Sequence, residues 1–258
     1  MIIISIILVL IIILIITYIK ISMNNSSKLG MGEDNPHNEM NREEIMDMLG
    51  YKDEDIKYIN LHKQMFLGRH KLKKGKTIND IIITKEGAYS FTSSRYMDDI
   101  LRHANKFFMG DINTASDITA NIGASALTMA DYYNVVAYEI NEETFMIMEY
   151  NLSLFDKNIE CINDSFFNHI SDINNTDLVF YDPPWGGPEY KEHETYDIVI
   201  NDHGLEDVAN LITTNIIMKL PLNADISFVH NLGRDYKKFY TEKKGKKKWL
   251  NLMIRAHN

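Results

Sequence analysis

Short apolar runs alternate along most of the chain with segments whose apolar residues recur every three or four positions. The runs predict strands at residues 117–123, 134–140, 159–164, 177–183 and 225–231, with a further strand within 246–258. The helical spacing is clearest at 92–107 and 141–155. Strands that alternate with helices form βαβ units. The pattern therefore predicts the α/β fold class, with a mostly parallel sheet flanked by helices.

The beginning of the chain has a different pattern. Residues 1–19 are nearly all Ile, Leu and Val, and as a helix they would span roughly 28 Å, close to the thickness of a bilayer core. One interpretation is a transmembrane anchor, with the rest of the chain facing the cytosol because Lys20 and Lys28 follow it. The other is that translation starts at Met23, which would leave a cytosolic or nuclear protein without this segment.

Changes in composition divide the chain into four parts. A hydrophobic segment at 1–21 precedes a polar linker at 22–42, whose composition is typical of disorder. Residues 43–110 predict a small helical N-terminal lobe, and residues 111–258 form the α/β domain. The formal net charge is −9, and Cys161 is the single cysteine. These values exclude a general attraction to nucleic acid and a disulfide framework, so a nucleic-acid substrate would need a local basic patch.

Polar residues follow the first three predicted strands, at the edge where open α/β folds bind ligands. Asp117 leads into a turn in which Asn121 and Gly123 tolerate positive φ, so that backbone amides can approach a ligand. Glu139 follows the second strand and can accept both hydroxyls of a ribose. Asp164 follows the third strand and can accept from an adenine amine. Each feature taken alone also fits an ordinary turn or a helix cap.

A stronger feature, Asp182-Pro183-Pro184-Trp185, follows the buried apolar run at 177–181. Two prolines fix φ and remove amide donors, so the turn is rigid and its carbonyls face outward as acceptors. A carboxylate and a carbonyl can hold an aromatic amine by its two hydrogens, while Trp185 stacks on the ring. In this order, the four features predict an S-adenosylmethionine-dependent methyltransferase that acts on an exocyclic amine.

The sequence DPPWGGPEY, with ETYDI shortly after it, resembles the cap guanine-N2 methyltransferases, the trimethylguanosine synthase family. Two further segments, KEGAYSFTSSRYMDDI and ITTNIIMKLPLNADI, support this likeness, which covers residues 57–256. The resemblance implies a class I methyltransferase sheet with a small helical N-terminal lobe, and S-adenosylmethionine as the methyl donor. The implied acceptor is a 7-methylguanosine RNA cap or cap nucleotide, which becomes di- or trimethylguanosine.

The resemblance also implies roles for single residues. Positions that bind or cover the methyl donor correspond to Tyr89, Thr92, Asp117, Gly123, Glu139 and Asp164, with Asn121 and Asp182 beside them. Positions that hold the amine and the cap base correspond to Asp182, Pro183, Trp185, Tyr190 and Asn223. Because 7-methylguanine is cationic, stacking on Trp185 gains a cation–π contribution of about 1–2 kcal/mol. Leu222 stands where the family has an arginine, which removes one candidate phosphate contact.

Two basic clusters are candidates for contact with the cap triphosphate or the RNA chain. One spans residues 69–76 and includes Lys74 and Lys76, and the other spans residues 243–248; solvated turns are the alternative for both. Three other functions stay open. They are an amino-methyltransferase for rRNA, tRNA or DNA with the same turn, a cap- or donor-binding module without activity, and a membrane-tethered scaffold. No metal ion is expected.

Overall fold

The computed structural model describes residues 41–48, 50, 62–108 and 110–257, and the chain from Asn41 onward forms one compact unit. The predicted hydrophobic segment at 1–21 and nearly all of the linker at 22–42 lie outside the described residues. A membrane anchor therefore stays a prediction. Among the helices that the structure describes, none combines the length and the apolar character needed to cross a bilayer.

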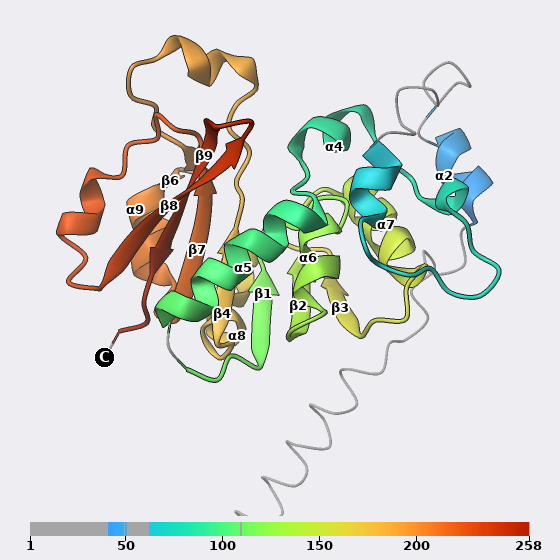
Figure 1. The fold of residues 1–258 in the computed structure, drawn as a ribbon, viewed down its shortest axis with the longest axis horizontal. Coiled ribbons are helices and arrows are strands. Elements are labelled where there is room, and N and C mark those ends of the chain that lie inside the picture. The colour runs from blue at the N-terminus through green and yellow to red at the C-terminus, as the bar shows by residue number, and fades with distance from the viewer. Residues whose placement is uncertain (1–40, 49, 51–61, 109, 258) are drawn as a thin grey trace, which may run out of the picture. The chain divides into compact units, whose positions relative to one another are not determined.

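Within the described residues, a seven-stranded sheet forms the centre of the unit (Figure 1), in the order β3-β2-β1-β4-β7-β9-β8. Its strands are β1 (Thr114–Asp117), β2 (Asn134–Tyr138), β3 (Ile159–Ile162), β4 (Leu178–Tyr181), β7 (Asn215–Leu220), β8 (Tyr236–Lys243) and β9 (Lys246–Ile254). Strands β1, β2, β3, β4 and β7 pair in parallel, whereas β9 runs antiparallel to both of its neighbours. This mostly parallel sheet confirms the predicted fold class. A separate pair consists of β5 (Val199–Ile200) and β6 (His203–Gly204).

Helices lie on both faces of the sheet and beside it (Figure 1). They are α2 (Arg42–Met48), α4 (Lys85–Ser90), α5 (Ser94–Phe108), α6 (Ala124–Met129), α7 (Glu142–Ser153), α8 (Ile170–Asn174) and α9 (Leu205–Leu211). Four 3₁₀ turns are described: η2 (Ile78–Asp80), η3 (Phe166–His169), η4 (Pro188–Glu192) and η5 (Ser227–His230). Figure 1 shows α5 and α6 in front of the sheet and α8 and α9 behind it. The buried residues of α5 recur every three or four positions, which turns one face of this helix toward the sheet.

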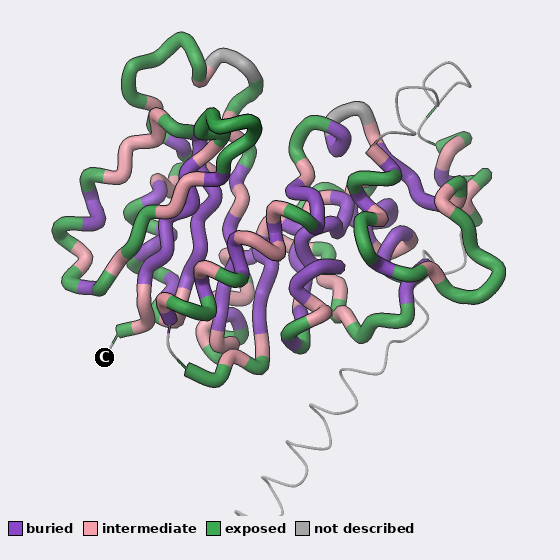
Figure 2. The backbone as a smooth tube through the Cα atoms, viewed as in Figure 1, coloured by how far each residue is buried: buried purple, intermediate pink, exposed green. Residues whose placement is uncertain are grey.

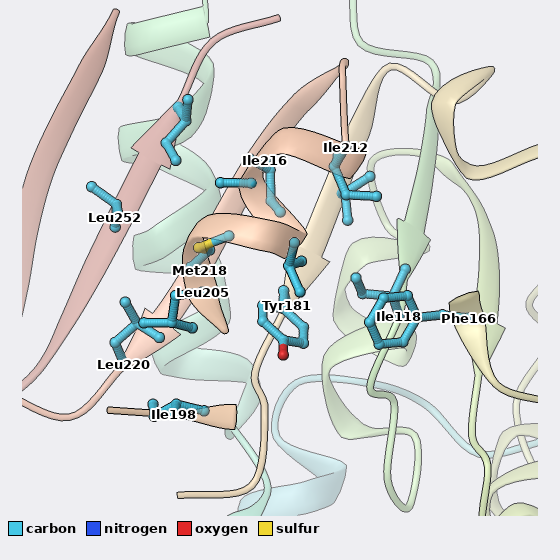
Figure 3. Packing of buried hydrophobic residues seen from close by; sticks show 14 of the residues in the cluster. Ile118, Phe166, Tyr181, Ile198, Leu205, Ile212, Ile216, Met218, Leu220 and Leu252 are labelled. Carbon is cyan, nitrogen blue, oxygen red and sulfur yellow. The ribbon is translucent and has the colours of Figure 1, made fainter. Parts of the chain in front are cut away.

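The central strands are buried on both faces, as Figure 2 shows. All four residues of β4 and five of the six residues of β7 are buried, as expected for parallel strands between two helical layers. Behind the sheet, Tyr181, Met218 and Leu220 pack with Leu205 of α9 and Ile198 in one hydrophobic cluster (Figure 3). This packing fixes the strand ends that carry the candidate site.

Two strand predictions are wrong in position. Strand β1 ends at Asp117, so residues 118–123 form the turn that follows the strand. Residues 225–231 contain the 3₁₀ turn η5, and the strand of this region is β7 at 215–220. The reason is burial: β7 is a buried, mostly apolar run that includes Lys219, whereas Phe228 and Val229 reach the core from a turn. The edge strand β8, which is rich in lysine, was not predicted.

The chain reverses its direction along the sheet between β1 and β4. From β1 the chain proceeds outward through β2 and β3, and it then returns to form β4 on the other side of β1. Asp117 pairs in register with Phe180, so Asp117 and Asp182 end neighbouring strands at the same edge. Ligands of open α/β sheets bind outside the carboxyl ends of the strands at such a switch point. The topology therefore places the candidate site here.

Candidate active site

The turn after β1 contains two residues in the left-handed region. Asn121 has φ 51° and Gly123 has φ 92°, which confirms that this turn needs residues that tolerate positive φ. A Cβ atom on Gly123 would lie 2.9 Å from Cγ of Leu152 on α7. A side chain at position 123 is therefore unfavourable, because of both the backbone conformation and the lack of space.

Glu139 lies directly after β2 and fixes the turn from the neighbouring strand. Its carboxylate accepts from the backbone N–H of Asn121 and from that of Asn141, each at 2.9 Å. Asn163 reinforces this end of β2, because its side-chain amide donates to the Glu139 carbonyl at 2.9 Å. The carboxylate is thus held at the carboxyl edge of the sheet, next to the left-handed turn. Its contact with a ribose stays a prediction.

Asp117 is completely buried at the end of β1. Its carboxylate accepts from the Ser125 hydroxyl at 2.5 Å and, more weakly, from the Thr119 amide at 3.4 Å. Burial raises the pKa of Asp117 to about 7, and the carboxylates of Asp182 and Glu139 add to the rise. Three carboxylates therefore gather at one edge of the sheet, an arrangement that favours a positively charged ligand.

Asp182 follows β4 and is held by groups from three other elements. Its backbone N–H donates to the Thr119 hydroxyl at 2.8 Å. One carboxylate oxygen, Oδ2, accepts from the Thr92 hydroxyl at 3.3 Å and from the Lys219 ammonium at 2.6 Å. Burial raises the pKa of Asp182, and the charge of Lys219 opposes the rise. The next residue, Pro183, is buried and has a fixed φ, so the turn is rigid.

Trp185 lies in a group of aromatic rings beside Asp182. The Tyr190 ring meets the indole edge-on, with centroids 5.5 Å apart and an interplanar angle of 88°. The Lys219 ammonium lies 4.9 Å from the centroid of Trp185 and 4.9 Å from that of Trp249. Both indole N–H groups are buried and have no hydrogen-bond partner among the described residues. Sequence reasoning missed Lys219 and Trp249, although a lysine inside the apolar run IIMKL was a visible signal.

The segment before α5 covers the left-handed turn. Asn121 donates from its side-chain amide to the Ser90 hydroxyl at 3.0 Å, and Thr92, which is 3% exposed, reaches Asp182. Tyr89, directly before Ser90, is 76% exposed. The structure thus brings Tyr89 and Thr92 to the same edge as the three carboxylates, although Asp117, the first of these in the chain, follows Thr92 by 25 residues.

Asn223 acts on the loop after Trp185. Its side-chain amide donates to the carbonyls of Tyr190 and His193, at 2.6 and 2.9 Å. A Cβ atom on Gly186, which has φ 72°, would lie 2.5 Å from the Tyr196 hydroxyl. These contacts determine the path of the loop and the position of Tyr190. A direct contact of Asn223 with the cap stays a prediction.

Asp164 is engaged by its own turn. Its Oδ1 accepts from the Ser165 amide at 2.7 Å and from Asn168 at 2.9 Å, and its Oδ2 lies 3.0 Å from His169 Nε2. The hydrogen bond from the Ser165 backbone holds the pKa of Asp164 low, and the bonds from Asn168 and His169 add to this effect. These contacts stabilise the beginning of η3. Binding of an adenine amine by Asp164 stays a prediction.

The two basic clusters lie at opposite edges of the sheet. Beside Lys74 and Lys76, the Lys73 amide donates to the Leu154 carbonyl, at the end of α7 that leads to the beginning of β3. The cluster at 243–248 forms the β8–β9 turn, which continues beyond the last β7 pair, Leu220 with Leu250. The β8–β9 turn therefore lies at the edge that carries Asp182, and Figure 1 shows it there. The structure does not bring Lys74 and Lys76 to this edge.

Cys161 lies on β3, away from the carboxylates. Burial raises the pKa of its thiol to about 12, so the thiolate is not formed at neutral pH. In the described part of the chain, no group of three or more His, Cys, Asp or Glu residues could hold a metal ion.

Comparison with known proteins assigns a family to this arrangement. Residues 112–253, more than half of the chain, match the model of the family described as RNA cap guanine-N2 methyltransferase. The chain belongs to this family. The match includes the whole sheet except the last residue of β9, together with Asp182, Lys219 and Trp249. Thr92 and Tyr89 precede it.

Two individual proteins are similar to this family member. An uncharacterized protein of Acanthamoeba polyphaga mimivirus is 32% identical over 139 residues, which cover 50% of this chain and 54% of the relative. The chain thus matches about half the length of that relative. A crystal structure from Porphyromonas gingivalis, described as a methyltransferase, covers 91% of this chain and 57% of its own, with a TM-score of 0.56 and 15% identity. This likeness shows a methyltransferase fold.

Proposed function

We propose that the chain transfers methyl groups from S-adenosylmethionine to the exocyclic N2 amine of a 7-methylguanosine RNA cap. The observation that carries the proposal is the rigid Asp182-Pro183-Pro184-Trp185 turn at the switch point of the sheet, with a carboxylate that is 14% exposed beside an indole. Membership of a family described as cap guanine-N2 methyltransferases supports the choice of amine.

The residues around the β1 turn fit S-adenosylmethionine. This donor carries its transferable methyl group on a positively charged sulfonium, and the carboxylates of Asp117, Glu139 and Asp182 gather where burial and mutual repulsion raise the pKa of Asp117. Glu139, oriented by two backbone amides, would accept the ribose hydroxyls. The left-handed turn at Asn121 and Gly123 lets the backbone approach the ligand closely.

The Asp182 turn would orient the acceptor. The N2 amine would donate one hydrogen bond to the Asp182 carboxylate and one to the Pro183 carbonyl, which points the nitrogen lone pair at the methyl carbon. Such positioning can lower a barrier by roughly 7–11 kcal/mol. The amine becomes acidic only after the new C–N bond forms. Asp182 or water then takes the proton, and a covalent enzyme intermediate is not needed.

Trp185 and the β8–β9 turn would bind the rest of the cap. A 7-methylguanine ring stacked on Trp185 gains a cation–π contribution of about 1–2 kcal/mol. Leu222, 46% exposed, cannot bind phosphate as the family arginine is expected to do. The exposed lysines of residues 243–248 lie at the same edge and provide positive charge for the phosphates.

The test uses labelled S-adenosylmethionine with four acceptors at equal concentration: 7-methylguanosine diphosphate, guanosine diphosphate, uncapped RNA and DNA. We expect label on 7-methylguanosine diphosphate, at N2, and little on the others. Transfer to uncapped RNA or DNA that the cap nucleotide does not inhibit would instead support a general amino-methyltransferase. Quenching of tryptophan fluorescence by the cap nucleotide without any transfer would support a binding module.

A further inference from the structure

Lys219 occupies a cage made of Trp185, Trp249 and Asp182. Its neighbours on β7, Met218 and Leu220, point into the core behind the sheet (Figure 3), so Lys219 points to the opposite face. There the ammonium lies 2.6 Å from the Asp182 carboxylate and 4.9 Å from each indole centroid. Lys219 is only 5% exposed.

The surroundings hold this cage rigidly in place. Trp249 comes from β9, which pairs with β7 so that Lys219 lies opposite Asn251. The Tyr96 ring of α5 meets Trp249 edge-on, with centroids 5.0 Å apart. Two indoles and a carboxylate around one point are the groups that proteins use to bind a ligand cation. Here a cation of the chain itself fills that point.

The Lys219 ammonium changes the electrostatic environment of a purine that is stacked on Trp185. It neutralises Asp182, and it lies over the same indole on which a base would stack. The Lys219 ammonium therefore repels a positively charged base stacked on this indole, whereas a neutral base is not repelled. The interaction falls only slowly with distance where water is excluded, so the effect is felt by a base in direct contact with Trp185.

We propose that Lys219 determines the charge preference of the base site, and that it weakens the preference for cationic 7-methylguanine over neutral guanine. The proposal rests on the proposed function, since it concerns the same acceptor. It makes Lys219 a specificity-determining residue that acts through Trp185 and Asp182. Both bases carry the same amine, so Lys219 distinguishes them by their charge.

The experiment measures the dissociation constants of 7-methylguanosine diphosphate and guanosine diphosphate by tryptophan fluorescence, and reports their ratio. We expect Lys219→Met to raise the preference for the methylated nucleotide by roughly tenfold. This direction requires that Asp182 stays ionised, because its unbalanced carboxylate then attracts the cationic base, so the ratio is measured at several pH values up to the alkaline range. Asp182→Asn, which leaves the ammonium uncompensated, is expected to lower the ratio below that of the wild type. Loss of the amine contact affects both nucleotides and cancels in the ratio.

Two controls accompany these variants. Lys219→Arg keeps the charge and is expected to keep the wild-type ratio. Lys237→Met makes the same chemical change at an exposed position of β8 and is expected to leave it unchanged. If Lys219→Met fails to fold, the fall in the ratio for Asp182→Asn still tests the proposal. An unchanged ratio in both variants overturns the role of Lys219 and leaves the proposed function standing. Failure of both nucleotides to bind the wild type, or to accept methyl groups, overturns the proposed function itself.

Discussion

The carboxyl edge of the sheet consists of two halves that are built in different ways. The β1–β2 half, with Asp117, Asn121, Gly123 and Glu139, is assembled within 23 consecutive residues by hydrogen bonds to the backbone. The β4–β9 half joins Asp182 to side chains from α5's N-terminal flank, β7 and β9 through an ion pair and aromatic contacts. The first half is a local turn, whereas the second exists only once the strands are in order.

The two halves also differ in their charge. In the β1–β2 half, burial raises the pKa of Asp117 and the carboxylates of Asp182 and Glu139 add to the rise, which makes the binding of a cation favourable. In the β4–β9 half, Lys219 already balances Asp182. We infer that the first half is suited to a cationic methyl donor, and that in the second half Lys219 reduces the contribution of charge to the selection of the acceptor.

The largest expected effect concerns the β1–β2 half. Gly123→Ala combines a backbone at φ 92° with a Cβ atom 2.9 Å from Leu152, and we expect a loss of about 2–5 kcal/mol in the free energy of unfolding. Gly75→Ala is the matched control, since Gly75 has φ +87° with no atom within 4 Å of the added Cβ. Denaturant unfolding measures both. Equal losses would mean that the contact with Leu152 does not constrain the turn.

The next effect concerns the β4–β9 half. Asp182→Asn keeps the size of the side chain but removes the charge that we propose accepts from the amine, and we expect methyl transfer to fall roughly a hundredfold. Binding of S-adenosylmethionine, measured by calorimetry, should change much less. Asp235→Asn, at a carboxylate that is 74% exposed, is the control. Full activity of Asp182→Asn would remove this carboxylate from the mechanism.

Asp117 makes the stability of the β1–β2 half depend on pH. Its pKa of about 7 in the folded protein exceeds the ordinary value of 3.8, so the folded state binds a proton more tightly than the unfolded chain. Its contribution to stability is therefore full below the unfolded pKa and is lost as the pH rises through the folded pKa. We expect the free energy of unfolding, relative to Asp117→Asn, to fall by about 2 kcal/mol between pH 5 and pH 8. Parallel curves for the two proteins would contradict the raised pKa.

The difference between the halves also explains how much the sequence could predict. The left-handed turn was predictable, because Asn121 and Gly123 are the residue types that adopt positive φ. The Asp182 turn was predictable from its two prolines, as was the α/β class from the alternation of strands and helices. The cage around Lys219 was not. Asp182 lies 37 residues before Lys219 in the sequence, and Trp249 lies 30 residues after it. Only the insertion of β9 beside β7 brings Trp249 next to Lys219.

The smallest expected effect separates the two basic clusters. The β8–β9 turn continues past the end of β7 on the edge that carries Asp182, whereas Lys74 and Lys76 lie near the end of α7 at the other edge. We expect Lys243→Ala with Lys246→Ala to raise the KM for capped RNA roughly three- to tenfold at low salt and to weaken its salt dependence.

The double variant Lys74→Ala with Lys76→Ala removes the same number of charges and serves as the control for that measurement. A simple effect of net charge on RNA binding would change the KM equally in both double variants. A larger effect at Lys74 and Lys76 would mean that the RNA crosses the β2–β3 side of the unit. Because the β8–β9 turn lies at the edge that carries Asp182, we expect it to contact the phosphates of a cap whose base stacks on Trp185, and the β4–β9 half alone to select the acceptor.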